Sequence, residues 1–227
     1  EKSKAIVPPW PTDFQLPASD YYSIAVWSQD GTRVAYSGGF LADGTRVPYT
    51  VDRDILIVHQ QHGIIYRINN SNINGVTVSD LKFSPDGRFL VSVDDDTIVT
   101  AWDIYVAGNY EQLGGNTDQL HMWNMKEDLG EIRTHDCSID ISACSTYIVI
   151  ASNSYMSNRV IVKSVENGGT VRSLTVPQPV MDGLFEVIFS MDCRAVFLCG
   201  SVGNSSIIKL WRSYLDDADE DSLITLW

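Results

Sequence analysis

Few residues in this sequence have the types and spacing that catalysis or metal binding requires. His59 and His62 have the H-x-x-H spacing with which two imidazole groups can bind Zn²⁺. No cysteine or acidic residue nearby completes a tetrahedral set of ligands, so we expect no metal site. The run from Asp94 to Asp96 contains carboxylates that could act as general acid or base. In a polar loop between two strands, however, such residues serve mainly in turn formation and solubility.

The motifs of two large enzyme classes are absent. A serine peptidase would need a nucleophile elbow such as G-x-S-x-G, and the sequence contains none. The phosphate-binding motif G-x-x-x-x-G-K-[ST] is also missing. We therefore expect a protein that is not an enzyme, with no catalytic residues and no cofactor.

An acidic loop lies near the end of the sequence, after Trp211. Its five carboxylates fall within six residues: Asp216, Asp217, Asp219, Glu220 and Asp221. A cluster of this kind attracts Lys/Arg-rich segments of a partner, because the like charges sum to a strong local potential. The alternative is an ordinary solvated loop.

The overall charge favours protein partners over nucleic acid. Asp and Glu total 29 against 16 Lys and Arg, which gives a net charge of −13 and a surface that repels phosphate backbones. No run of eighteen apolar residues could span a bilayer, and no signal-peptide pattern is present. The four cysteines form no C-x-x-C pair and indicate reduced thiols. We expect an intracellular protein of the cytoplasm or nucleus.

A repeated pattern of strand, tight turn and strand organises the chain. In its clearest copy, Val78–Phe83 and Arg88–Val93 alternate apolar and polar residues on either side of the turn Ser84–Gly87. Pro85 presets φ, and Gly87 tolerates a positive φ. Three other turns also open with serine: Ser28–Gly31, Ser142–Ser145 and Ser190–Cys193.

Each predicted hairpin is followed by further apolar strands. The expected third strands are Asp54–Val58, Thr97–Ile104, Arg159–Lys163 and Ile207–Trp211. Weaker fourth strands are Gly63–Ile68, Thr170–Leu174 and Ser222–Trp227. Four antiparallel strands per repeated unit are typical of a propeller blade. The sequence therefore predicts an all-β fold, a β-propeller of four-stranded antiparallel blades.

The residues that carry this pattern resemble a known family. Phe83–Gly87 together with Trp102-Asp103 resembles a WD repeat, and Leu120–Asn124 resembles a second, weaker Trp-Asp ending. The resemblance extends over residues 23–227. A Gly-His pair often precedes the first strand in that family, but only Thr134-His135 comes near it here. The chain is thus similar to a divergent member. The segment Trp27–Tyr36 is also similar to propellers attached to serine peptidases.

The spacing of the repeats leaves the number of blades open. The turn serines are 56, 58 and 48 residues apart, against a typical period of about 40–45. An insertion at Gly38–Arg53 explains the first interval. The second interval has two possible explanations. Either Gln119–Met125 is the outer strand of the same blade, or a stretch of chain is missing between about Tyr105 and Gly115. We expect the latter, because Gly114–Leu120 is typical of a second strand running into a third.

These patterns predict a domain organisation. Residues 1–20 contain four prolines and form a Pro-rich N-terminal extension, since such a segment cannot be an interior strand. Residues 21–227 form a propeller of four to five blades, as a ring of its own or as part of a seven-bladed ring. The expected blades are roughly 21–70, 76–125, 126–176 and 182–227.

The loops between blades and between second and third strands should share one face and bind partners. Aromatic, Met and Arg side chains dominate interface energetics, and the candidates in these loops are Phe40, Arg46, Tyr49, Tyr155, Met156 and Met181. We expect a non-catalytic scaffold within a hetero-complex, with partners that include basic segments. The alternatives are the non-catalytic propeller of a hydrolase and a reader of basic, histone-like peptides.

Overall fold

Four antiparallel sheets of four strands each make up the described part of the protein. A computed structural model describes residues 24–37, 55–60, 62–68, 78–94, 96–104, 118–125, 137–152, 157–177, 181–212 and 223–226. In every sheet the strands follow one another in chain order, so each sheet is a meander. We call these sheets blades one to four. The all-β fold of four-stranded antiparallel blades that the sequence predicts is confirmed.

The strand bounds follow the repeat. Blade one contains β1 (Ile24–Trp27), β2 (Arg33–Ser37), β3 (Ile55–His59) and β4 (Gly63–Ile68). Blade two contains β5 (Val78–Phe83), β6 (Phe89–Asp94), β7 (Ile98–Asp103) and β8 (Asp118–Asn124). Blade three contains β9 (Cys137–Ile141), β10 (Tyr147–Ser152), β11 (Ser157–Ser164) and β12 (Thr170–Pro177). Blade four contains β13 (Gly183–Phe189), β14 (Val196–Val202), β15 (Ser205–Trp211) and β16 (Leu223–Thr225).

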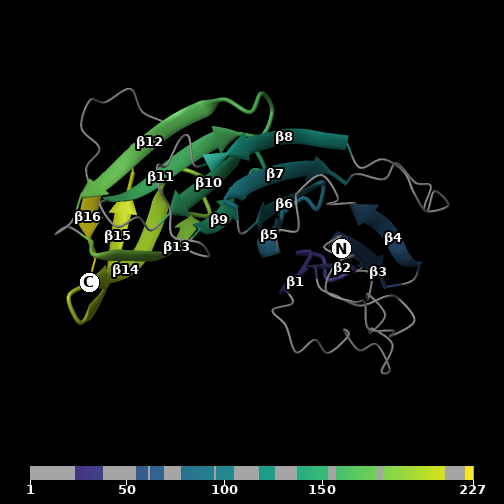
Figure 1. Ribbon diagram of the computed structural model, residues 1–227, viewed down its shortest axis with the longest axis horizontal. Helices are drawn as coiled ribbons and strands as arrows, with labels where there is room; N and C mark the ends of the chain where they lie inside the picture. Colours follow the sequence, from purple (N-terminus) through teal and green to yellow (C-terminus); the bar gives the residue numbers. More distant parts are fainter. Residues whose placement is uncertain are drawn as a thin grey trace, which may run out of the picture.

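The blades stand side by side in an arc (Figure 1), with their first strands in contact in the order β1, β5, β9 and β13. Apolar side chains fill the space between neighbouring blades. On β6, Leu90 belongs to the cluster shared with blade one, and Val91 to the cluster shared with blade three. Both are fully buried, and such burial stabilises the fold by about 1.5–3 kcal/mol for a side chain of this size. The alternation along the strand thus joins each inner blade to both neighbours.

The expectation that chain is absent between about Tyr105 and Gly115 depended on assigning the segment that follows as a third strand, and that assignment is wrong. The segment expected to be a third strand with a Trp-Asp-like ending is β8, which pairs antiparallel with β7 from Ile98 and Asn124 to Asp103 and Asp118. It is therefore the outer strand of blade two. The apparent Trp-Asp ending misled the prediction, because Trp123 occurs here in a fourth strand, where it packs on blade three.

The serine that opens each turn has a common structural role. In all four turns its hydroxyl accepts a hydrogen bond from the backbone N–H five residues later, at 2.9 Å for Ser28, 2.8 Å for Ser84, 3.0 Å for Ser142 and 2.9 Å for Ser190. The third residue after each serine has a positive φ: Gly31, Gly87, Ser145 and Cys193. The first strand of each blade therefore reverses into the second through the same local conformation.

Candidate functional site

The order of the strands separates the connections onto two faces. Because every blade is an antiparallel meander, its serine turn and its third-to-fourth connection emerge at the same end, which we call the turn face. The second-to-third connections and the links between blades emerge at the other end, which we call the loop face. The second-to-third and between-blade loops that the sequence analysis proposed to bind partners belong to the loop face, whereas the acidic loop falls between β15 and β16 and is a third-to-fourth connection.

Most of the predicted contact residues lie outside the described residues. These are Phe40, Arg46, Tyr49, Tyr155 and Met156, and the acidic loop Asp216, Asp217, Asp219, Glu220 and Asp221. In the sequence, Tyr155 and Met156 fall between β10 and β11, in a second-to-third connection.

Met181 is described, and it is a packing residue. Its side chain is fully buried in the cluster between blades three and four. Gly200 on β14 makes the space for it, because a Cβ there would lie 2.7 Å from the Met181 sulfur. The structure therefore differs from the expectation that Met181 presents its side chain to a partner, because this side chain packs in the core between blades three and four.

Hydrogen bonds fix the loop face between blades three and four. Asn158, fully buried at the start of β11, donates from Nδ2 to the Met181 carbonyl at 2.7 Å. The Asp182 N–H donates to the Ser201 carbonyl at 2.7 Å, and the Asp182 carboxylate accepts from the Gly203 N–H. These bonds join the start of β11, the two residues before β13 and the end of β14 with the turn that follows it. Sequence reasoning missed Asn158 and Asp182; the only available signal was a short polar side chain beside a strand end.

The acidic run after β6 forms a turn. The Asp94 carboxylate accepts from the Ile98 N–H at 2.8 Å, and the Asp94 carbonyl accepts from the Thr97 N–H at 2.9 Å. Thr97 has a φ of 64°, which a tight reversal requires. Asp94 is 4% exposed. Its contacts are those of a turn-forming residue. This agrees with the expectation that the run serves in turn formation rather than as a general acid or base.

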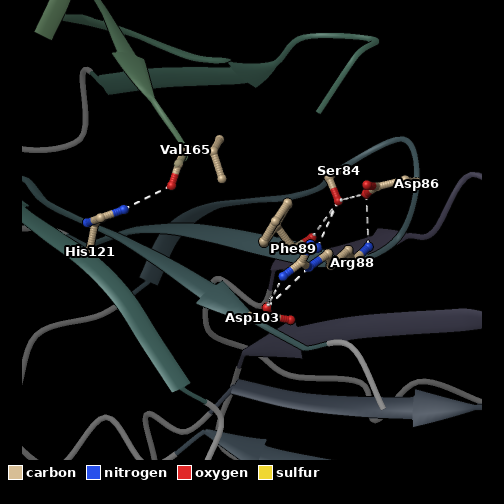
Figure 2. Close-up of polar contacts among 7 residues, drawn as sticks. All are labelled: Ser84, Asp86, Arg88, Phe89, Asp103, His121 and Val165. Atoms are coloured by element: carbon tan, nitrogen blue, oxygen red, sulfur yellow. Dashed lines mark hydrogen bonds and ion pairs between the residues drawn. The ribbon is translucent and has the colours of Figure 1, made fainter. Parts of the chain in front are cut away.

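Two polar contacts of blade two involve Trp102 and Asp103, the pair that carries the resemblance to a WD repeat. The Trp102 indole N–H donates to the Ser92 hydroxyl at 3.1 Å, so two groups of the family's polar network meet although the histidine is missing. The Arg88 guanidinium forms an ion pair with the Asp103 carboxylate, and the shortest N–O distance, from Arg88 Nη2 to Asp103 Oδ2, is 3.0 Å (Figure 2). The pair is partly exposed, and we expect it to contribute less than about 1 kcal/mol.

The described histidines contact other groups of the protein. His121 of β8 contacts the Val165 carbonyl of blade three through Nε2 at 2.9 Å (Figure 2). The His59 and His62 rings lie 4.8 Å apart. Partial burial, with the neighbouring His62 and Arg33, lowers the pKa of His59. No group of three His, Cys, Asp or Glu side chains that could hold a metal occurs in the described parts of the chain.

Carboxylates of the inner strands link successive blades. Asp140 on β9 accepts from the Phe189 N–H of β13 at 2.8 Å, and Asp80 on β5 accepts from the Ile139 N–H of β9. Burial raises the pKa of both carboxyl groups. These acids therefore satisfy backbone donors of the next blade and hold the inner edge of the arc together.

Aromatic side chains of the inner strands bear on the peptide-reader hypothesis. Trp27 and Phe185 are exposed, but they belong to blades one and four, at the two ends of the arc (Figure 1). Phe83 and Phe189 are buried between blades. The two exposed rings therefore do not share one cage, which recognition of a methylated lysine would require.

Comparisons with known proteins support the fold. The sequence matches no model of a known protein family. The structure resembles the β-propeller domain of Cps50 (Swd1) from Myceliophteria thermophila, with a TM-score of 0.60 and 14% identity, over 83% of this chain and 52% of that chain. It also resembles Raptor from Chaetomium thermophilum, with a TM-score of 0.56 and 12% identity, over 83% of this chain and 15% of that one.

One curated protein shares a short segment. Protein HIR1 of Kluyveromyces lactis is 32% identical over 53 residues, which are 23% of this chain and 6% of that protein. The chain thus spans about half of the Cps50 domain and a small part of the other two proteins. At these identities the structural likeness establishes a β-propeller fold. No helix among the described residues is both long and apolar enough to cross a membrane.

Proposed function

We propose that this β-propeller is a divergent, non-catalytic WD-repeat scaffold that binds other proteins through its loop face. It acts inside the cell as a subunit of a hetero-complex. Rigid blades hold loops that are far apart in sequence on one surface, so the mechanism is the presentation of those loops in a fixed arrangement.

The observation that carries the proposal is the hydrogen-bonded loop face between blades three and four. Asn158, Met181, Asp182 and Ser201 connect segments of both blades before any partner arrives. Binding of a partner then costs this protein less conformational entropy, because the strands that flank its contact residues are already ordered. Tyr155 and Met156 lie in the connection that Asn158 follows, which makes them the first candidates for contact residues.

The charge of the chain defines the expected partner. A net charge of −13 and the acidic loop at residues 216–221 favour proteins with basic segments and disfavour direct contact with nucleic acid. Such complementarity raises the association rate and is screened by salt. We therefore expect partner capture to weaken between low and high ionic strength.

Affinity capture from cells that express the protein, followed by mass spectrometry, tests the proposal. Tyr155→Ala combined with Met156→Ala should remove specific partners that the wild-type chain retains, by about tenfold or more in abundance if the two side chains anchor the interface. The matched control is Met191→Ala, which truncates a methionine that is 85% exposed on the turn face. Retention of every partner by the double variant, with loss of partners from the control, would show that the loop face is the wrong surface.

A further inference from the structure

Serine turns of neighbouring blades touch one another on the turn face. Between blades two and three, the Asp86 N–H donates to the Ser145 hydroxyl at 3.4 Å, and the same hydroxyl hydrogen-bonds the Asp86 carboxylate. Asp86 is the second residue after its turn serine, and Ser145 is the third after its own. A short acidic side chain and a hydroxyl group therefore join these two turns.

The corresponding positions between blades three and four are both cysteine. Cys144 takes the position of Asp86, and Cys193 takes the position of Ser145, with nearly the same backbone: φ is 57° at Cys193 and 56° at Ser145. The Cys144 N–H donates to the Cys193 sulfur at 3.1 Å, and the two thiol groups hydrogen-bond each other. The architecture of the turn face thus brings together two thiols that are 49 residues apart in sequence.

The two sulfur atoms have different environments. Partial burial acts to raise the pKa of Cys144, but hydrogen bonds from Ser142, Thr146 and Cys193 outweigh it and lower the pKa to about 7. Ser142 Oγ lies 3.3 Å from the Cys144 sulfur. Burial and the neighbouring Cys144 raise the pKa of Cys193. Cys144 is solvent-exposed, so near pH 7 an accessible and partly ionised thiol lies beside a partner thiol that stays protonated.

We propose that Cys144 and Cys193 are a reversible oxidation site for peroxides, in which Cys144 is the nucleophile and Cys193 is the resolving thiol. The Cys144 thiolate attacks one oxygen of hydrogen peroxide, the O–O bond breaks, and the leaving hydroxide takes a proton to form water. Cys144 is then a sulfenic acid. The Cys193 sulfur attacks the Cys144 sulfur, the S–O bond breaks, and the hydroxide leaves with the Cys193 proton as a second water.

The overall step is balanced. Two thiols are oxidised to one disulfide by loss of two electrons and two protons, and one peroxide is reduced to two waters. A dithiol such as dithiothreitol reverses the oxidation by exchange. The product is a covalent link between blades three and four on the turn face, at a contact that blades two and three maintain with hydrogen bonds alone.

Peptide mapping of the full-length chain tests the site. In a Cys137→Ser, Cys199→Ser background, Cys144 and Cys193 are the remaining thiols. Hydrogen peroxide should produce a tryptic pair in which residues 134–159 are linked to residues 173–194, with a mass two hydrogens below the sum. Dithiothreitol should restore the separate peptides. If the background variant does not fold, the same linkage is sought in wild-type protein, with fragmentation to identify the linked cysteine.

Two further variants distinguish the chemistry from accidental oxidation. In Cys193→Ser, peroxide should leave a Cys144 sulfenic acid that dimedone labels. The double variant Cys144→Asp with Cys193→Ser copies the Asp86–Ser145 contact, and it should fold normally and form no link. Iodoacetamide should modify Cys144 about tenfold faster than Cys199 at pH 7, because burial and Glu186 raise the pKa of Cys199. Peroxide-treated protein in which both thiols remain open to alkylation, or in which Cys144 joins Cys137 or Cys199, would overturn the proposal.

Discussion

At the scale of single residues, the repeated serine is the main local determinant of the fold. Ser84 accepts the Phe89 N–H at 2.8 Å and donates to the Asp86 carboxylate at 2.5 Å (Figure 2). A hydroxyl group does both because it is donor and acceptor at once. The same contacts recur at Ser190, with Asp192 and Ala195. Serine at this position therefore stabilises the reversal in each blade through one arrangement of hydrogen bonds.

The two serines differ in burial, which gives a prediction. Ser84 is fully buried, whereas the contacts of Ser190 are partly exposed. Ser84→Ala should lower the free energy of unfolding by about 1–3 kcal/mol, because the Phe89 N–H loses its partner away from water. Ser190→Ala should cost less than about 1 kcal/mol, since water can replace the hydroxyl. Urea denaturation of both variants measures the difference. Equal losses would show that burial of the turn does not set its contribution.

A second prediction at this scale concerns Asp140. Burial is the largest cause of its raised pKa, and Glu186 adds to it, while N–H donors and Lys82 act in the opposite direction. The native carboxyl group therefore binds its proton more tightly than the unfolded one. Its contribution to stability is complete below the unfolded pKa, near 4, and is lost as pH rises through the native value. At pH 7 the ionised group destabilises the fold.

Asp140→Asn should accordingly be more stable than wild type at pH 7, because the amide oxygen can still accept from the Phe189 N–H. This advantage should shrink as pH falls through the raised native pKa, where the wild-type carboxyl group becomes neutral, and should be lost by about pH 4, near the unfolded pKa. Asp192→Asn is the control of opposite sign, since hydrogen bonds from Ser190 and Arg194 lower the pKa of Asp192. Thermal denaturation across this pH range measures both. Greater wild-type stability at pH 7 would contradict the expected cost of burying the Asp140 charge.

At the scale of elements, β8 connects blade two to the β11–β12 turn of blade three. His121 contacts the Val165 carbonyl, and the Trp123 indole donates to the Gly168 carbonyl at 2.9 Å. Gly168 has a φ of 69°, and a Cβ there would lie 2.6 Å from His121 Nδ1. The Val165 contact and the neighbouring Trp123 ring hold the imidazole in place. Glycine is therefore required for both the backbone and the space.

Gly168→Ala and Gly203→Ala separate these two requirements. Gly203 also has a positive φ, but nothing lies within 4 Å of a Cβ at that position. Gly203→Ala should cost about 1 kcal/mol from backbone strain, and Gly168→Ala about 1–3 kcal/mol more from the clash. Adding His121→Ala should reduce the Gly168→Ala cost to the Gly203→Ala level. Urea denaturation of the variants measures each cost; equal costs in the presence of His121 would mean that blade two adapts freely to the added methyl group.

At the scale of the whole molecule, the blades differ in how many neighbours cover them. Every residue of β6 is buried, and five of the six residues of β10 are buried. On β14, buried Val196 and Leu198 alternate with half-buried Phe197 and Cys199. Blade three covers the first pair, while the second pair faces away from it. Blade four is therefore covered on one side by the described residues.

Hydrogen exchange should follow this order of coverage. Amides of β6 and β10 should exchange more slowly than those of β14, because local opening of blade four exposes less apolar surface. Mass spectrometry of deuterated peptides from each second strand measures the rates. Equal protection of β14 and β10 would mean that another surface covers blade four in solution.

The sequence by itself determined the strands, the serine turns and the class of fold. Each of these depends on residues close together in the chain, such as Ser84 with Phe89, whose side-chain type largely decides the local backbone conformation. Alternation along Phe89–Asp94 likewise indicated the strand without knowledge of its neighbours. The choice of partner-binding loops remains a prediction.

Only the tertiary structure decided what the blades share. It made β8 an outer strand, placed Met181 in the core beside Asn158, and brought Cys144 next to Cys193. Contacts between residues dozens of positions apart depend on how neighbouring sheets pack, and each residue alone carries no signal of its distant neighbour. Cys144 and Cys193 looked like ordinary turn residues until adjacent blades placed their turns in contact.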